Sequence, residues 1–440
     1  MIDFIPFIAI AWFSYFIRNN RINNTIVGLI FLSYLFFATN YTNLGLDLSF
    51  NIFRLLHRII GIVSILMFFM YVLKNRVNIL HEWVPKILIL YMLVLIFSFL
   101  GNDIYLEHYI HYMRNFVFIS LIVLFLYYKV DSQDKLYELF KLISLATLLL
   151  SLFVLIEMSG KGWVSDGESR LLRVSLFYSN PNYLAVALLP GFTLLIFSQK
   201  KYNQILSSIV LVSIFATGSK AAELSVVFVL LLFIFKNFKN FNKIYLSIII
   251  LAVISVVILF FNKIVINDSY NNTRFIMAKI VINIFHEHPI NGIGYGQFRT
   301  KFYHYIDQDI MLMKDDEMKV ALFANNPNSP LLGNIFKGYK ESDKQHIINS
   351  HKEKMTHNDL LTVIGELGLL GLAFLFFLLY KLYLELKKLL LHSRNNYFLS
   401  IGLIGGSLIF SLFHNNLTSF VFWFILFVPF IMNRNHERTI

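Results

Sequence analysis

The sequence contains no cysteine and few charged residues. Without cysteine the chain forms no disulfides, no zinc–thiolate site and no cysteine nucleophile. Only 15% of its 440 residues are charged and 57% are hydrophobic, which is too little charge to cover the two or three soluble domains expected for this length. Internal repeats, low-complexity tracts and Pro-rich linkers are also missing, which counts mildly against a transporter, since many transporters contain repeats.

Apolar runs recur from one end of the chain to the other, as in polytopic helical membrane proteins. The sequence therefore predicts an all-α integral membrane protein with twelve or thirteen transmembrane helices. The first run has no basic residues before it and no small-residue cleavage site after it, so we expect a retained span. The expected spans lie near residues 2–17, 24–39, 58–73, 87–101, 115–128, 138–158, 182–198, 205–218, 221–236, 244–262, 360–380, 398–414 and 419–433.

The net charge of +12 fits the excess of Lys and Arg in the cytoplasmic loops of membrane proteins. No basic stretch with interleaved aromatic residues indicates nucleic-acid binding. Basic connectors such as Lys200–Lys201 and Lys381–Arg394, and the tail from Arg434, are expected on the cytoplasmic side.

This orientation divides the chain into three parts. Residues 1–262 are expected to form an N-terminal bundle of transmembrane helices, and residues 263–358 a large extracytoplasmic (periplasmic) loop with helical segments. Residues 359–440 are expected to form the C-terminal transmembrane helices and a short cytoplasmic tail. The middle part holds 12 Lys and Arg against 10 Asp and Glu, so the cytoplasmic bias does not explain its basic residues.

Three cations are predicted at the outer membrane face. Arg274 begins an apolar segment that Pro289 ends, so we expect a helix at or in that face, where Arg grips phosphate through two N–H groups. Lys220 lies in an outer turn between two spans, and Arg173 adds a third cation. Snorkelling to lipid headgroups explains Arg274 and Lys220 as well.

Residues 355–380 read MTHNDLLTVIGELGLLGLAFLFFLLY and place a histidine at the mouth of an apolar span. Thr356 and Asp359 have the spacing of a capping box, which would put His357 at the first helical position. Free N–H groups there favour an anion, and the helix dipole favours a neutral imidazole that accepts a proton. An interfacial histidine bonded to a loop fits the same spacing.

Glu366 lies inside the same span, about 13 Å along the helix axis from His357 and roughly 180° around it. It therefore cannot share a site with His357 through this helix. We expect a structural anchor, because a carboxylate inside a membrane needs a partner on another helix or its proton. Gly365, Gly368 and Gly371 form a stripe of small residues that is expected to let another helix pack closely.

The remaining polar motifs are weaker. Gly292, Gly294 and Gly296 follow no predicted strand, so they indicate a tight return and not a nucleotide-binding fingerprint. The acidic residues between Asp307 and Glu317 lack EF-hand spacing and are expected on a solvated face. The sequence thus predicts neither a metal site nor a cofactor.

Four segments in a fixed order carry a family resemblance. They are an Arg-rich stretch leading into SNPNYLAVALLPG, the turn TGSKAAEL, Arg274 followed by HPINGIGYGQF, and THNDLLTVIGELGLLG. Together they span roughly residues 165–385 and resemble the O-antigen ligase/polymerase superfamily of bacterial membrane glycosyltransferases. Lys220 departs from this pattern, because Arg is usual there; Lys keeps the charge but loses the bidentate fork.

The resemblance implies a GT-C-like architecture and an inverting glycosyltransferase that uses neither a metal nor a nucleotide sugar. Its donor would be a glycan linked to undecaprenyl diphosphate, outside the bacterial cytoplasmic membrane. The acceptor would be a lipid-linked repeat unit in a polymerase, which we favour, or the lipid A core in a ligase. His357 and Arg274 would be catalytic, and Arg274, Lys220 and Arg173 would bind the diphosphate. Chain-length regulators, flippases and membrane lipids are the implied further partners.

Two other classes of function fit the hydropathy. A flippase or other transporter of lipid-linked glycans would string polar residues along a central path through the membrane, whereas those singled out here cluster at one predicted face. A non-catalytic scaffold of a polysaccharide assembly complex would tolerate loss of Arg274 and His357.

Overall fold

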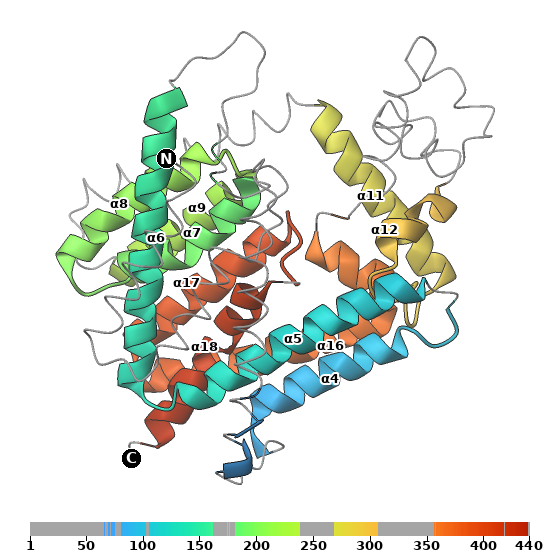
Figure 1. The fold of residues 1–440 in the computed structure, drawn as a ribbon, viewed down its shortest axis with the longest axis horizontal. Coiled ribbons are helices and arrows are strands. Elements are labelled where there is room, and N and C mark those ends of the chain that lie inside the picture. Colours follow the sequence, from blue (N-terminus) through green and yellow to red (C-terminus); the bar gives the residue numbers. More distant parts are fainter. Residues whose placement is uncertain are drawn as a thin grey trace.

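The computed structural model describes residues 81–102, 105–161, 181–237, 268–306, 358–417 and 419–438, with isolated positions between 66 and 74 and at 174, 176 and 356. Within these ranges every regular element is helical (Figure 1). The elements are α4 (Trp83–Phe97), α5 (Leu106–Lys129), α6 (Gln133–Lys161), α7 (Pro181–Ile196), α8 (Lys201–Ala216), α9 (Lys220–Asn237), α11 (Asp268–Glu287), α12 (Phe298–Lys301), η4 (Phe302–Tyr305), α16 (Asp359–His392), α17 (Arg394–Ser411) and α18 (Phe420–Glu437).

The predicted helices are present throughout the described part of the chain. Each apolar run predicted there, from 87–101 to 419–433, forms a helix, and the apolar segment after Arg274 forms α11. Three of the described helices, α5, α6 and α16, are long and apolar enough to cross a membrane. The predicted spans 2–17, 24–39 and 244–262 lie outside the described residues, and 58–73 is described only at isolated positions. The total number of spans, the GT-C-like architecture and the three-part division therefore stay predictions.

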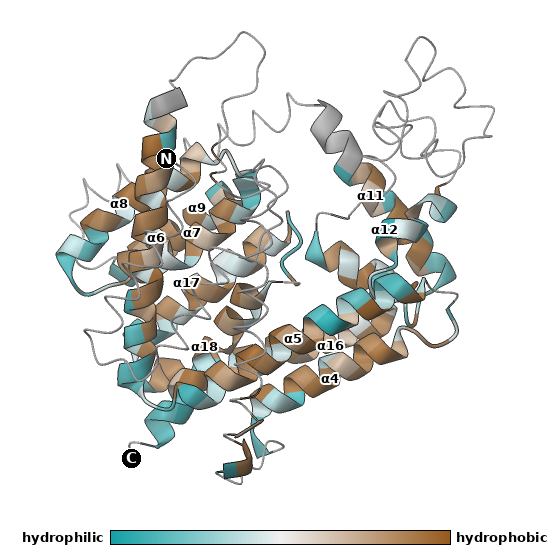
Figure 2. Cartoon of the chain, viewed as in Figure 1, coloured by the Kyte–Doolittle hydropathy of each residue, from teal (hydrophilic) through white to brown (hydrophobic). Residues whose placement is uncertain are grey.

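The helices pack in two groups that share α17. In the first, α7 contacts α6, α8, α9 and α17, and α17 also packs along α9. In the second, α16 contacts α4, α17 and α18, and α5 contacts α4 and α18 (Figure 1). The elements α11 and α12 pack on α16 and carry a smaller apolar core of their own. Most stretches of the helices consist of hydrophobic residues, as expected for a chain in contact with lipid (Figure 2).

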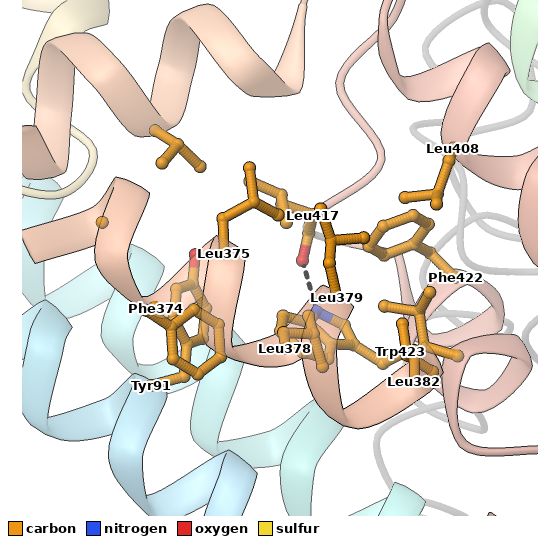
Figure 3. Close-up of a pocket in the computed structure, with 13 residues that line it drawn as sticks. Tyr91, Phe374, Leu375, Leu378, Leu379, Leu382, Leu408, Leu417, Phe422 and Trp423 are labelled. Carbon is orange, nitrogen blue, oxygen red and sulfur yellow. Dashed lines mark hydrogen bonds between the residues drawn. The ribbon is translucent and has the colours of Figure 1, made fainter. Parts of the chain in front are cut away.

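Trp423 of α18 lies at the centre of the main core and is fully buried. Its ring packs against Tyr91 of α4 at 5.2 Å and Phe116 of α5 at 5.7 Å between centroids. Its indole N–H donates a 2.8 Å hydrogen bond to the carbonyl of Leu417 (Figure 3). The small pocket beside it is lined by apolar side chains, mainly of α16 and α18, and by Tyr91. It is a gap in the packing, and no charged side chain lines it that could bind an anion.

The C-terminal end of α18 differs from the sequence-based expectation. Arg434, which the sequence assigns to a basic tail, belongs to the helix and is only 6% exposed. Its guanidinium donates a 2.7 Å hydrogen bond to the carbonyl of Val130 and lies over the Tyr127 ring at 4.1 Å. It therefore joins α18 to the end of α5, because a buried guanidinium needs acceptors that a loose tail does not provide.

Helix α16 is broken at Gly368, which has φ 59° and ψ −146°. Such a backbone conformation is essentially restricted to glycine. The break leaves backbone N–H and C=O groups of α16 without partners in the helix. The loop of residues 289–297, called here the return loop, forms hydrogen bonds with them. Four backbone hydrogen bonds join them: Ile293 N–H to Gly365 O (3.0 Å), Gly294 N–H to Glu366 O (3.1 Å), Leu369 N–H to Pro289 O (2.8 Å) and Leu370 N–H to Ile290 O (3.0 Å).

The Glu366 side chain completes this junction. Its carboxylate accepts hydrogen bonds from the backbone N–H groups of Gly296 at 2.9 Å and Phe298 at 3.0 Å. Glu366 is thus an anchor, as predicted from the free-energy cost of a carboxylate inside a membrane. Its partners, however, belong to a loop and a short helix and not to another span. The glycines of the return loop at 292, 294 and 296 all have positive φ, which confirms the predicted tight return.

The predicted glycine stripe on α16 is only partly a packing surface. A Cβ at Gly365 would make ordinary contact with Val281 of α11 and Phe298 of α12, so α11 and α12 approach the helix there. The stripe prediction is wrong at Gly368, which forms the break, and at Gly371, where a Cβ would collide with the same helix and not with a neighbour. The break tilts the helix and changes which face the glycines share.

Candidate functional site

The start of α16 is capped two residues later than the sequence predicts. The helix begins at Asp359, and the side chain of Asn358 accepts a 3.1 Å hydrogen bond from the N–H of Leu361. The predictions that Thr356 is the N-cap and that His357 holds the first helical position are therefore wrong. The amide oxygen of Asn358 reaches the free N–H groups, and Asn is among the preferred N-cap residues. The Thr356 hydroxyl instead bonds to Thr362 at 2.6 Å.

Two of the predicted site residues, His357 and Arg173, lie outside the described residues. Both of the neighbours of His357 are placed by hydrogen bonds to the rest of the site, through the Thr356 hydroxyl and the Asn358 side chain. Val174, next to Arg173, donates its N–H to the carbonyl of Ala216 at 3.1 Å. That bond places Val174 beside the turn that precedes Lys220.

The segment between α17 and α18, residues 412–417, is the hub of the site and is called here the hub loop. It reads LFHNNL, and it connects the start of α16 with α11. Five hydrogen bonds make these connections: Asn358 Nδ2 to Leu412 O (2.7 Å), Arg274 Nη2 to Phe413 O (3.0 Å), Thr356 Oγ1 to Asn415 Oδ1 (3.3 Å), Asn416 N–H to Asp359 Oδ2 (2.7 Å) and Leu417 N–H to Asp359 Oδ1 (3.2 Å).

Arg274 is therefore fixed at the start of α16. Its guanidinium donates to the Phe413 carbonyl and lies over the Phe413 ring at 5.4 Å. The helix that carries it is held by apolar side chains, among them Ile276 and Ile280, which are fully buried against α12 and α16.

Lys220 is placed differently from Arg274. It is the first residue of α9, and its ammonium forms a 2.7 Å ion pair with Glu223 one turn later. Glu223 is largely buried. The carboxylate neutralises the charge of this turn, so Lys220 has to exchange that partner before it binds an anionic ligand. Arg274, by contrast, contacts a neutral carbonyl in the hub loop.

Sequence reasoning missed the hub loop and its histidine. His414 is 5% exposed, and its ring packs edge-on against Tyr183 of α7 at 5.3 Å. Its Nδ1 lies 3.4 Å from the carbonyl of Asn415. The signal that marks this loop is a run of three polar residues, His414-Asn415-Asn416, between two apolar spans.

The return loop carries a buried tyrosine that is not a proton acceptor. Tyr295 packs against Tyr112 of α5 at 5.7 Å, and its N–H donates to the Ser98 hydroxyl. Burial raises the pKa of the Tyr295 phenol well above its ordinary range, and the nearby Tyr91 and Glu366 add to this shift. Within the described residues no three His, Asp or Glu side chains gather as a metal site would require.

Comparison with known families gives one match. Residues 205–319 match the family model described as O-antigen ligase. This segment is about a quarter of the chain and contains most of α8 together with α9, α11, α12 and η4, with Lys220 and Arg274. A search of curated proteins gives no match. The match confirms the resemblance to the O-antigen ligase/polymerase superfamily over this segment, and the apolar helices fit a membrane protein.

Proposed function

We propose that this chain, whose residues 205–319 match the family model described as O-antigen ligase, is a membrane glycosyltransferase that polymerises a surface polysaccharide. It takes a glycan from undecaprenyl diphosphate and transfers it to the terminal sugar of a lipid-linked repeat unit, outside the bacterial cytoplasmic membrane. A ligase would use the same donor and transfer the glycan to the lipid A core. The family match fits both acceptors.

One observation supports this proposal above the others. Arg274 lies within the matched segment, and its guanidinium donates to the hub loop. The same loop bonds to Thr356 and Asn358, the residues on either side of His357 in the sequence. We therefore propose that Arg274 and His357, from segments far apart in the sequence, act at one polar junction.

In the proposed reaction, Arg274 binds the diphosphate of the donor. His357 accepts the proton of an acceptor hydroxyl, and the hydroxyl oxygen attacks the anomeric carbon. The bond between that carbon and the diphosphate oxygen breaks, and the guanidinium stabilises the charge of the leaving diphosphate. Direct displacement inverts the anomeric carbon, and the chemistry requires no metal ion.

Lys220 and Arg173 have supporting roles in this proposal. Lys220 contributes after its ammonium leaves Glu223 for a phosphate oxygen. Arg173, the residue before Val174 in the sequence, adds a further cation in this proposal. Because a Lys ammonium lacks the planar fork of Arg, its contribution to diphosphate binding is smaller than that of Arg274.

Complementation of a deletion strain tests the proposal. Wild type, His357→Ala, Arg274→Ala and the exposed control Arg438→Ala are expressed, membrane levels are matched, and the surface polysaccharide is resolved by length. We expect the control to restore long chains and the two site variants to leave single repeats on the acceptor. A bare acceptor with lipid-linked chains accumulating would identify a ligase. Wild-type chain lengths in both site variants would remove the catalytic role and favour a scaffold or a transporter.

A further inference from the structure

Two lysines meet at one tryptophan where α4 and α16 pack against each other (Figure 1). The ammonium of Lys381 lies 3.4 Å from the centroid of the Trp83 ring, and the ammonium of Lys86 lies 4.8 Å from it. Trp83 and Lys86 belong to the first turn of α4, whereas Lys381 lies in the second half of α16. Further along the pair, Tyr91 stacks on Phe374 at 4.6 Å between centroids (Figure 3). The helices are therefore antiparallel, and the two lysines share one end of the pair.

Aromatic rings hold Lys381 at this position. Besides the Trp83 ring, its ammonium lies 5.7 Å from the ring centroid of Phe377 and 6.0 Å from that of Tyr380. A cation within about 6 Å of a ring centroid is attracted by the quadrupole of the ring. Because a ring carries no net charge, these contacts place the ammonium without neutralising it. A lysine that only snorkels to water has no such partners.

The carboxylates that come next in the sequence of each helix have other partners. Glu82, which precedes α4, accepts a 2.9 Å hydrogen bond from the hydroxyl of Tyr127 of α5. Glu385 follows Lys381 by four residues, a spacing at which ion pairs form on a helix. It pairs instead with Lys388 at 3.0 Å. Neither carboxylate therefore neutralises the two lysines at the tryptophan.

The charge of this lysine pair is uncompensated by protein carboxylates. No ion pair in the described part of the chain involves Lys86 or Lys381, and three other lysines form those present there. Lys86 donates a 3.4 Å hydrogen bond to the carbonyl of His81, which is neutral. The two ammonium groups are separated by no more than the sum of their distances to the ring, which is less than the Debye length of about 10 Å at 0.1 M salt. They repel each other, and an anion bound to both would remove this repulsion.

The surroundings of the lysine pair favour a lipid as the source of that anion. Lys381 begins the basic connector expected on the cytoplasmic side, and Trp83, which is 41% exposed, is of a residue type enriched at headgroup level. One to two turns further into the membrane, Leu93 of α4 is 41% exposed and Phe376 of α16 is 68% exposed. A ligand with an anionic head and apolar tails meets both the charges and these side chains. Basic pockets between transmembrane helices on the cytoplasmic side bind anionic headgroups.

We propose that Lys86, Lys381 and Trp83 form a binding site for one anionic phospholipid of the cytoplasmic leaflet. The two ammonium groups bind its phosphate, the indole ring positions them, and the acyl chains lie along α4 and α16. The bound lipid joins the two helices where their own charges repel each other. The site lies toward the opposite end of α16 from the hub loop, so it does not depend on the proposed function.

The affinity for the first bound lipid tests this site. Full-length protein in a neutral detergent is titrated with phosphatidylglycerol and analysed by native mass spectrometry, and phosphatidylcholine with the same acyl chains is the uncharged comparison. We expect wild type to prefer phosphatidylglycerol. In Lys86→Ala/Lys381→Ala the apparent Kd for phosphatidylglycerol should rise roughly tenfold, while that for phosphatidylcholine stays unchanged.

Two further variants separate the site from the general charge of the protein. Lys201→Ala/Arg438→Ala is the matched control, because it removes two exposed cations from the same predicted side, and it should keep the wild-type Kd. Lys86→Arg/Lys381→Arg keeps both charges and should also retain binding. The midpoint of thermal unfolding without added lipid identifies variants that are folded. If the double Ala variant does not fold, Lys86→Ala and Lys381→Ala are titrated singly, and each should weaken binding.

Four results would overturn the inference. The first is a wild-type Kd in the folded variants that lack Lys86 or Lys381. The second is equal weakening in Lys201→Ala/Arg438→Ala, which would mean that only net charge matters. The third is equal affinity of wild type for phosphatidylcholine and phosphatidylglycerol. The fourth is displacement of phosphatidylglycerol by inorganic phosphate at equal concentration, which would identify a site for free phosphate and not for a lipid.

Discussion

The carboxylate of Glu366 accepts a 2.9 Å hydrogen bond from the backbone N–H of Gly296. With the second bond, from Phe298, both oxygens of this intramembrane carboxylate are occupied, one by the return loop and the other by the first residue of α12. These two bonds connect the broken helix α16 with the return loop and α12, which follow α11 in the chain. Because α11 carries Arg274 and α16 begins beside His357, the Glu366 junction sets the distance between the two halves of the proposed site.

Glu366→Ala is expected to destabilise the protein and to reduce its activity. It removes the acceptor of two buried N–H groups, each of which then costs about 1–3 kcal/mol. Glu366→Gln keeps one acceptor oxygen and should fall between wild type and Ala. The measurement is the midpoint of thermal unfolding in detergent. Glu287→Gln, an exposed carboxylate at the end of α11, is the control, and an equal shift for Glu287→Gln and Glu366→Ala would contradict the anchor.

Gly368→Ala should be more destabilising than Gly101→Ala. Both glycines have positive φ, at 59° and 77°, so both substitutions strain the backbone, by about 1–2 kcal/mol. At Gly368 a Cβ would also lie 2.7 Å from backbone atoms of the return loop, whereas at Gly101 nothing lies within 4 Å. The difference between the two unfolding midpoints isolates the contact with the return loop. Equal midpoints would show that the loop moves away without cost.

Asp359→Ala should lower activity while the protein stays in the membrane. The carboxylate holds the hub loop through the N–H groups of Asn416 and Leu417, and the same loop supplies the carbonyl that positions Arg274. We expect at least a tenfold loss of transfer, corresponding to about 1.4 kcal/mol of barrier. Asp131→Ala, a partly exposed carboxylate paired with Lys135, is the control. If Asp359→Ala produced polysaccharide of normal chain length at matched expression, the hub loop would not be needed for function.

Glu223→Gln is expected to strengthen binding of a diphosphate lipid, because it releases Lys220 from its 2.7 Å ion pair. Lys220→Ala should weaken binding, but less than Arg274→Ala. The apparent dissociation constant for undecaprenyl diphosphate measures both effects. Binding that is unchanged in Glu223→Gln and in Lys220→Ala would mean that this pair only stabilises the first turn of α9.

Hydropathy predicts the helices of the described chain well, because burial of the backbone in lipid leaves helices as the main solution. The errors of this hydropathy prediction lie at the ends of the helices. The expected start of the first described span, residue 87, excludes Lys86, yet α4 begins at Trp83. The Lys86 ammonium lies over the Trp83 ring at 4.8 Å, so its long side chain tolerates a place in the first turn. Single-residue hydropathy does not contain that contact.

The sequence indicates less of the site than of the fold. It identifies Arg274 and Glu366 because a charged residue inside an apolar segment is costly and therefore stands out in the sequence. It misses the break at Gly368, because that backbone conformation depends on hydrogen bonds with a loop more than 70 residues earlier in the chain. It also misplaces the cap at Thr356, because Asn358 competes for the same N–H groups. The roles of His357, Arg173 and Lys220 stay proposals.

The bond between Gly296 and Glu366 joins residues 70 positions apart, so it closes the intervening chain at its base. Closing a flexible segment costs free energy that grows only with the logarithm of its length, about 0.6 kcal/mol for each doubling. Insertions and deletions between Ile306 and Thr356, within the closed segment, would therefore leave Arg274 and the start of α16 where they are. A glycosyltransferase of the proposed kind could exchange that part of the chain to suit a new glycan while its proposed reaction centre stays unchanged.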